Sequence, residues 1–273
     1  MPNKDITLFI PVRNGLPYIN DCVKSIRMQS FQDWQLVIVD NLSSDGTEEV
    51  CREYLSDHRI RYVRNDSDLG MIGNFNKCLD LCDSKYYALL SHDDRYECAD
   101  AVAEAYRILE SDSDISAVYS HINWIDEAGE AIMTRRFHRV GKVQSDAVAL
   151  DSILTCRNLF GVPILARRSR IEGKRYEQAF YHTADIELSI ATGRGASNFV
   201  IDRPCYAIRF HRTNSTMRSA SNVRPELSRM AVKYGIALSR AQRLQMRINE
   251  IVMRVQRRAF YTYLDHFRRV GRA

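Results

Sequence analysis

Short apolar runs alternate with helical patterns through the first 120 residues. The apolar runs cover residues 6–12, 34–40, 59–65, 85–91 and 115–120. The helical patterns cover residues 17–29, 46–55, 71–82 and 99–109. Strands that alternate with helices predict right-handed βαβ units, and therefore a parallel sheet with helices on both faces.

The pattern changes after residue 120. Residues 122–137 predict a hairpin with its turn at 126–130. The elements expected next are a helix at 145–155, a loop at 158–163, a strand at 164–168, a helix at 184–191 and strands at 196–202 and 205–211. We expect this half to continue the first sheet as a mixed sheet rather than to form a separate domain.

Apolar residues recur at three- and four-residue spacing from residue 225 to about 270, which predicts one long helix or two consecutive helices. The predicted fold is therefore α/β, with three regions. Residues 1–120 and 121–223 form two halves of one domain, and residues 224–273 form a helical extension.

The composition indicates the class of protein, and the charged residues are unevenly distributed along the chain. The 273 residues are 45% hydrophobic and 27% charged, as in an ordinary soluble protein. The start, MPNKDITLFIPV, lacks the apolar segment of a secretory signal, and no run approaches the roughly 20 apolar residues of a membrane span. Seven scattered cysteines without a CxxC motif indicate reduced thiols in the cytoplasm.

The net charge of +5 is concentrated at the C-terminal end. From Arg224 onward, twelve arginines or lysines stand against Glu226, Glu250 and Asp265. The last helix carries Arg243, Arg247, Arg254, Arg257 and Arg258 opposite an apolar stripe. That pattern is typical of a helix that lies on a membrane surface, although the apolar side can equally pack on the rest of the chain. No recognition motif supports nucleic-acid binding.

Polar clusters follow three of the predicted strands: PVRNG at 11–15, VDNLSSDGT at 39–47 and SHDD at 91–94. Ligands bind outside the carboxyl ends of strands in such sheets, so these clusters form one candidate site. Asp93 and Asp94 end a buried strand, where adjacent carboxylates repel each other and resist desolvation. Mn²⁺ or Mg²⁺ relieves this repulsion and also binds phosphates. The alternative is that one aspartate caps the next helix and the other is solvated.

Taken together, these segments resemble an inverting family 2 glycosyltransferase of the GT-A fold. Residues 10–47, IPVRNGLPYINDCVKSIRMQSFQDWQLVIVDNLSSDGT, resemble the opening of that family. Residues 69–94, LGMIGNFNKCLDLCDSKYYALLSHDD, resemble its third block, which ends in the metal motif. The resemblance extends from about Ile6 to Thr216. No glycine-rich phosphate loop is present.

The resemblance implies a UDP- or dTDP-sugar donor and a Mn²⁺ or Mg²⁺ cofactor. The residues it assigns to nucleotide binding are Pro11, Val12, Arg13, Asn14, Asp40, Asn41, Gly70, Asn76 and Asp93. Asp93 and Asp94 are implied as metal ligands. Many relatives have aspartate at the position of Asn41 and a carboxylate at that of Ser91. These departures weaken the assignment of the base and imply a lower affinity for metal.

The second half resembles the acceptor side of the family. Residues 181–195, YHTADIELSIATGRG, resemble the family's "[ED]-D-x-[DE]-L-x-x-R" block, which implies Asp185 as the general base and Glu187 as the second candidate. Inversion requires a carboxylate that takes the proton of the acceptor hydroxyl opposite the leaving diphosphate. The alternative for Asp185 is an N-cap or an acid favoured by the helix dipole.

Residues 206–216, YAIRFHRTNST, resemble the family segment "R-x-H-x-x-x-x-S". The resemblance implies that His211 reaches the metal or a phosphate and that Arg209 reaches the diphosphate. A histidine that ends a strand is also a common structural hydrogen-bonding group. Trp124 is a candidate for stacking on a sugar, or else a core or cleft-wall residue.

The prediction is a cytoplasmic, metal-dependent, inverting glycosyltransferase, associated with the cytoplasmic face of the membrane. It would transfer a sugar to a hydroxyl of a growing glycan, such as a lipid-linked precursor of a surface polysaccharide. A sugar-1-phosphate nucleotidyltransferase is an alternative, disfavoured by the missing glycine-rich loop. A non-catalytic relative that binds nucleotide or glycan is another, disfavoured by the presence of Asp93, Asp94 and Asp185.

Overall fold

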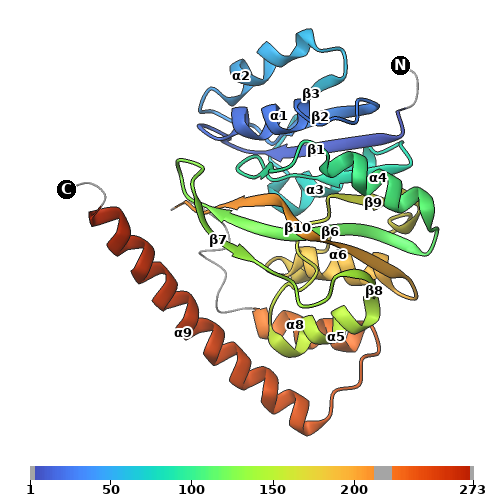
Figure 1. Ribbon diagram of the computed structural model, residues 1–273, viewed down its shortest axis with the longest axis vertical. Coiled ribbons are helices and arrows are strands. Elements are labelled where there is room, and N and C mark those ends of the chain that lie inside the picture. The colour runs from blue at the N-terminus through green and yellow to red at the C-terminus, as the bar shows by residue number, and fades with distance from the viewer. Residues whose placement is uncertain (1–3, 212–222, 271–273) are drawn as a thin grey trace.

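The chain folds around one mixed sheet with the strand order β3-β2-β1-β4-β9-β6-β10-β5, in which β7 also pairs with β6 and β8 with β10 (Figure 1). The computed structural model describes residues 4–211 and 223–270; in the last helix it describes the side chains up to Gln256 and that of Ala259. The predictions for residues 212–216 and for the side chains of Arg257 and Arg258 therefore concern parts of the chain outside the described residues.

Four parallel strands build the first half of the sheet: β1 (Ile6–Val12), β2 (Trp34–Asp40), β3 (Ile60–Arg64) and β4 (Tyr86–Leu89). The helices between and after them are α1 (Ile19–Arg27), α2 (Thr47–Glu53), α3 (Gly70–Asp80) and α4 (Ala101–Ser111). Every residue of β1 and β2 is buried, because parallel strands are covered by helices on both faces. The predicted alternation of strands and helices is confirmed here.

The second half is built around two long parallel strands, β6 (Ile115–Ile125) and β10 (Ser197–Arg209). The short strand β9 (Leu165–Arg167) runs antiparallel to both β4 and β6 and so joins the halves. The hairpin predicted after residue 120 is present as β6 and β7 (Ala131–Arg135). The remaining helices of this half are α5 (Ser145–Thr155) and α6 (Ala184–Gly193).

The two strands predicted at 196–202 and 205–211 are one strand, β10. Its pairing with β6 shifts register around Pro204, which has no N–H to donate, so the strand bends without ending. The sequence analysis missed the strands β5 (Arg95–Tyr96) and β8 (Gly141–Gln144), both antiparallel to β10. A strand of two to four residues is too short to show a hydrophobic period.

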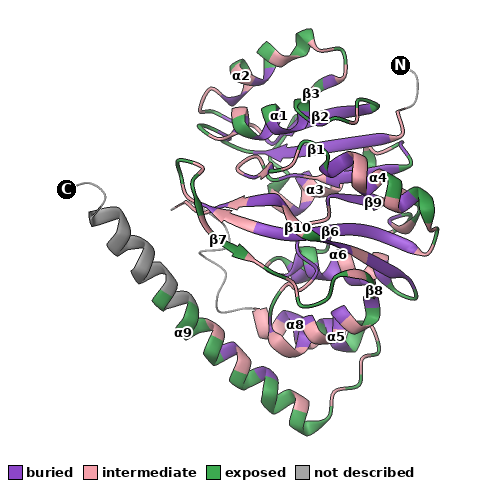
Figure 2. Cartoon of the chain, in the orientation of Figure 1, coloured by how far each residue is buried: buried purple, intermediate pink, exposed green. Residues whose placement is uncertain are grey.

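The core lies on both faces of the sheet (Figure 2). On one face, Leu8 and Ile10 of β1 pack among buried residues of α1 such as Val23. On the other face, Phe9 packs in a second buried cluster that includes Ile72 of α3. Alternate residues of one strand thus serve two separate cores, which explains its continuous apolar sequence.

The predicted C-terminal helical stretch is two helices, α8 (Val223–Lys233) and α9 (Arg240–Val270). Gly235 lies between them at a φ of +66°, a left-handed conformation that ends a helix and favours glycine. α9 runs along the outside of the molecule (Figure 1). Among the described residues, no helix combines the length and apolar character that a membrane span requires.

Candidate active site

The loops that follow β1 and β2 are bonded to each other at the carboxyl edge of the sheet. The Asn14 backbone N–H donates to Ser43 Oγ (2.8 Å), and the Ser44 N–H donates to Asn14 Oδ1 (2.9 Å). Asn14 has a φ of 54°, in the left-handed region that asparagine tolerates. Two of the polar clusters identified in the sequence therefore lie side by side, and Asn14 connects them through its two hydrogen bonds.

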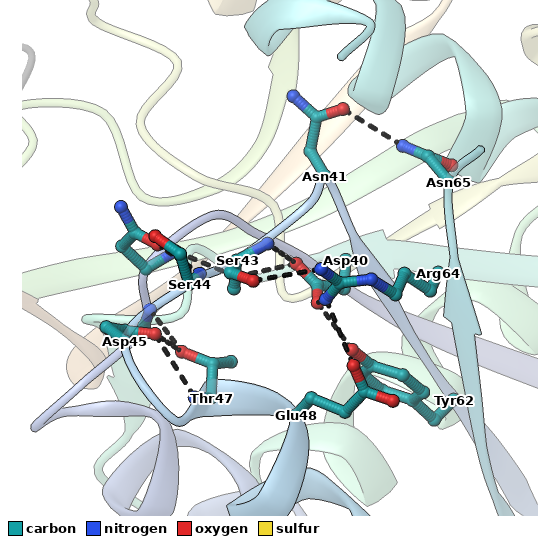
Figure 3. Close-up of polar contacts among 12 residues, drawn as sticks. Asp40, Asn41, Ser43, Ser44, Asp45, Thr47, Glu48, Tyr62, Arg64 and Asn65 are labelled. Atoms are coloured by element: carbon teal, nitrogen blue, oxygen red, sulfur yellow. Dashed lines mark hydrogen bonds and ion pairs between the residues drawn. The ribbon is translucent and has the colours of Figure 1, made fainter. Parts of the chain in front are cut away.

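Asp40, at the end of β2, is fully buried and has protein partners at both carboxylate oxygens (Figure 3). Oδ1 accepts hydrogen bonds from the Ser43 N–H (2.9 Å) and hydroxyl (2.6 Å). Oδ2 accepts from Arg64 Nη1 (2.7 Å) and from the Tyr62 hydroxyl. The carboxylate expected to contact the nucleotide thus organises the loop after β2 and its neighbouring strand. The sequence analysis missed Arg64, although Asp40 lies opposite it in the β2–β3 register.

Asn41 is also committed to the protein. Its Nδ2 donates to Asp68 Oδ1 (2.7 Å), and its Oδ1 accepts from the Leu69 N–H (2.9 Å). Asp68 pairs with Arg13 as well, and both side chains are about half exposed. The Gly70 N–H, then Arg13, hold the pKa of Asp68 below its ordinary value. Arg13 and Asp68 therefore place two exposed, opposite charges at this corner, and Asp68 was not among the predicted residues.

The other predicted nucleotide-binding residues have mainly structural environments. Pro11 and Val12 are buried in β1. Gly70 begins α3 with a φ of +65°. Asn76 exchanges two hydrogen bonds with the backbone of Tyr176 (3.0 and 2.9 Å), and so ties α3 to the second half of the chain.

The two aspartates after β4 have different surroundings. Asp93 Oδ2 lies 2.8 Å from His211 Nε2. Asp94 is buried; its Oδ1 accepts from the Arg209 N–H (3.1 Å) and its Oδ2 from the Tyr206 hydroxyl (3.2 Å). Burial and the charge of Asp93 raise the pKa of Asp94 well above its ordinary value. Burial is the largest influence on Asp93 and favours its neutral form too, but the His211 hydrogen bond and the charges of His92 and His211 together outweigh it, so the pKa of Asp93 is lowered.

Arg209 is the cation next to these acids. It is 1% exposed, and its guanidinium donates to the Asp93 carbonyl (3.0 Å) and to Asp21 Oδ2 (3.0 Å). The same group lies over the Tyr18 ring, 4.8 Å from its centroid. Arg209, which is predicted to reach the diphosphate, thus connects β10, α1 and the loop that holds Asp93. The rings of Trp124 and Phe210 are tilted at 54° to each other, with centroids 4.8 Å apart.

The side chains around Asp93 could act as ligands to a divalent cation. The structure brings the predicted ligands Asp93 and His211 into contact, whereas the oxygens of Asp94 already have protein partners. One carboxylate and one imidazole suit Mn²⁺ and leave positions for phosphate and water. The described part of the chain shows no cluster of three His, Cys, Asp or Glu side chains that could hold a metal. Phosphates of a substrate would therefore have to complete the coordination.

Asp185 lies in the first turn of α6, where Thr183 occupies the N-cap position. The residue is exposed, yet the surrounding protein displaces enough water to raise the pKa of its carboxyl above the ordinary value. The Asp185 charge also adds to the burial that raises the pKa values of Tyr119 and Tyr176.

Glu187, two residues further along α6, has the opposite environment. It is 1% exposed, and its Oε1 accepts hydrogen bonds from Lys233 Nζ (2.5 Å) and the Tyr234 hydroxyl at the end of α8. The second candidate for the general base thus ties α6 to α8. Asp185 is the one of the two acids that faces solvent.

The comparisons with known proteins agree with this architecture. The family model for glycosyl transferase family 2 matches residues 7–178. A putative teichuronic acid biosynthesis glycosyltransferase of Bacillus subtilis, TuaG, is 33% identical over 93 residues, which cover 34% of this chain and 37% of that protein. A GalNAc(5)-diNAcBac-PP-undecaprenol beta-1,3-glucosyltransferase of Campylobacter jejuni is 24% identical over 180 residues, or 64% of this chain and 56% of that protein. These matches span only part of each relative.

Solved structures are similar over most of the chain. S. aureus TarS 1–349 in complex with UDP-GlcNAc has a TM-score of 0.69 at 15% identity, over 89% of this chain and 70% of that chain. The mannosyltransferase PcManGT from Pyrobaculum calidifontis, in complex with GDP-Man and Mn²⁺, has a TM-score of 0.54 at 14% identity, over 95% and 84%. The predicted GT-A fold is confirmed. With a family model that matches well over half of its length, the chain belongs to glycosyltransferase family 2.

Proposed function

We propose that this chain transfers a sugar from a UDP- or dTDP-sugar to a hydroxyl of a growing glycan, with inversion and with Mn²⁺ or Mg²⁺. The observation that most strongly supports this function is the contact between Asp93 and His211. It lies beside the loop after β1, where the Tyr18 and His211 rings are 4.9 Å apart. Residues 1–120 would bind the donor and residues 121–223 the acceptor. The family match favours this reading over a nucleotidyltransferase.

The donor nucleotide would lie on the surface formed by the loops after β1 and β2. Asp40 and Asn41 shape this surface from below, and the exposed charges of Arg13 and Asp68 lie at its edge. A related structure in complex with UDP-GlcNAc supports a UDP-sugar, whereas another contains GDP-Man. The proposal of a pyrimidine base therefore needs a direct test.

Asp93 and His211 would hold the metal, with Asp94 behind them. A bound divalent cation offsets negative charge on a departing diphosphate. Arg209 contributes by position: it fixes the Asp93 loop through the carbonyl of Asp93 and fixes Asp94 through its own N–H. These two hydrogen bonds of Arg209 hold the loop in the position in which Asp93 contacts His211.

Asp185 would act as the general base. As the acceptor hydroxyl attacks the anomeric carbon, the ionised carboxylate takes its proton, and the bond to the diphosphate breaks on the opposite side. A raised pKa makes Asp185 a stronger base than an ordinary aspartate. General bases contribute about 10²–10⁴-fold to rate.

We propose a lipid-linked precursor of a surface polysaccharide as acceptor, at the cytoplasmic face of the membrane. Relatives named for teichuronic acid biosynthesis and for transfer to an undecaprenol-linked glycan support this class of acceptor.

A panel of nucleotide sugars, scored by thermal unfolding with Mn²⁺ and with chelator, tests the donor proposal. A ligand at about a hundred times its Kd stabilises the folded state by about 2.7 kcal/mol, so a UDP- or dTDP-sugar should raise Tm clearly in Mn²⁺. Asp93→Asn should lose the metal-dependent part of this rise. If no nucleotide sugar raised Tm in Mn²⁺, the donor proposal would be wrong. A rise without any sugar transfer would favour a non-catalytic relative.

A further inference from the structure

The outward face of α9 carries an apolar stripe. Leu244, Ile248, Ile251 and Val255 follow each other at spacings of four, three and four residues, so they share one face of the helix. They are 58%, 46%, 62% and 61% exposed. We call these four residues the outer stripe. Contiguous exposed apolar side chains mark sites of contact with proteins or membranes.

The opposite face of α9 already packs on the protein. Met246, Glu250 and Met253 each lie two residues after a member of the outer stripe, which is about half a turn of an α-helix. Met246 is 2% exposed, and Glu250 pairs with Arg224 at 2.7 Å. The Met253 sulfur lies 2.8 Å from Arg157 Nε, just after α5. Packing on the domain therefore accounts for the inner face of α9 and leaves the outer stripe unexplained.

A row of arginines lies along one side of the outer stripe. Arg243, Arg247 and Arg254 each immediately precede a stripe residue, so all three lie on the same flank, and all are exposed. Arg254 also pairs with Glu250 at 3.0 Å, so Arg243 and Arg247 contribute most of the positive charge on this flank. Between residues 240 and 259 the sequence holds a single acid, Glu250, and that residue is buried on the inner face. The exposed charge beside the stripe is thus positive.

This charge distribution selects between two partners. If two copies of α9 paired antiparallel through their stripes, the arginine flank of each would lie beside that of the other, and like charges would repel. A parallel pair would place the arginines opposite the flank that holds Gln245 and Val252, with no acid to pair with. An anionic lipid surface accepts both features, because the stripe enters the apolar boundary and the arginines meet the headgroups.

We propose that the outer stripe and the arginine flank bind α9 to the surface of an anionic membrane. Because the inner face stays packed beside α5, the helix can bind lipid without detaching from the domain. The glycosyltransferase domain would then be held against the leaflet that carries a lipid-linked acceptor. No residue of the proposed donor-binding surface takes part in this membrane contact.

Flotation of the full chain with lipid vesicles tests this proposal. We expect binding to vesicles of phosphatidylcholine with phosphatidylglycerol, and much weaker binding to phosphatidylcholine alone. Higher salt should weaken the binding. If the chain failed to float with the anionic vesicles at low salt, the proposal would be overturned.

Two double variants separate the apolar and the charged contributions. Arg243→Gln/Arg247→Gln should weaken binding to anionic vesicles about 30-fold, because each basic residue near such a surface contributes about fivefold. Ile251→Gln/Val255→Gln should weaken it by more than tenfold, and should do so at every salt concentration. All four side chains are exposed, so Tm should not change.

The matched control is Met28→Gln/Arg107→Gln, which removes an exposed apolar and an exposed basic residue far from α9 in sequence, and should bind vesicles as the parent does. Light scattering on the stripe variant tests the other partner. A dimeric parent that becomes monomeric in Ile251→Gln/Val255→Gln, with vesicle binding unchanged, would overturn the membrane proposal in favour of a second copy. Donor protection in thermal unfolding, measured on the same proteins, distinguishes this failure from a failure of the proposed function.

Discussion

Asp40 and Asp185 are both aspartates next to the predicted site, and their surroundings differ completely. Asp40 is fully buried at the end of β2, and Arg64, Tyr62 and Ser43 occupy its two oxygens. Asp185 is exposed, and the protein around it displaces enough water to raise the pKa of its carboxyl. The number of donors that each carboxylate meets therefore separates an acid that holds the fold from an acid available for chemistry.

The largest expected difference is in turnover. Asp185→Asn should lower kcat about 10²–10⁴-fold, because the amide cannot take the proton of the acceptor hydroxyl, while donor binding persists. Glu187→Gln is the matched control on the same helix: it should keep kcat within a fewfold and lower the free energy of unfolding by about 2 kcal/mol, since it weakens charge-assisted hydrogen bonds to Lys233. Unimpaired transfer by Asp185→Asn would remove Asp185 from its role.

The next difference is in stability. Asp40→Asn should lower the free energy of unfolding by about 2 kcal/mol, because it weakens the charge-assisted hydrogen bonds that Arg64 and Tyr62 donate to a fully buried carboxylate. Asp68→Asn breaks an ion pair with Arg13 in which both partners are half exposed, and should change stability far less than Asp40→Asn does. Denaturant unfolding of the two variants measures the contrast. Equal losses would mean that the burial of Asp40 has no energetic role.

The smallest difference is in pH dependence. The general base must be ionised, so kcat/KM should fall tenfold per pH unit below the raised pKa of Asp185. Ionisation of Asp185 lowers the free energy of unfolding, whereas ionisation of a salt-bridged acid raises it. A raised folded-state pKa means that ionisation costs folding free energy, so the penalty grows as pH rises from the unfolded to the folded pKa. At neutral pH, Asp185→Asn should therefore be slightly more stable than the parent. A less stable variant would contradict this environment for Asp185.

The site was predictable where its residues are neighbours in the sequence. The pair Asp93 and Asp94 stands out because two acids follow an apolar run, and the polar clusters after β1 and β2 follow from the same pattern. Asp68 was missed because its loop shows no distinctive spacing; only its contacts with Arg13 and Asn41 give it a place. Arg209 is predicted to reach the diphosphate, whereas its burial and its contacts with Asp93 and Asp94 are visible only in the structure.

The sequence alone predicts the longer strands and helices of the first half in their order, because hydrophobic periodicity is a local property of each segment; it predicts neither β5 nor β8, nor the continuity of β10. It also determined the asymmetry of charge and the face of α9 that is apolar. Tertiary structure alone decided which acids are neutralised: Asp40 meets Arg64 only through strand register, and Glu187 meets Lys233 from 46 residues away. It also decided that α9 packs through the face opposite its apolar stripe. Such contacts form between segments that are distant in the sequence, and a local pattern of residues does not show which distant segment a side chain will meet.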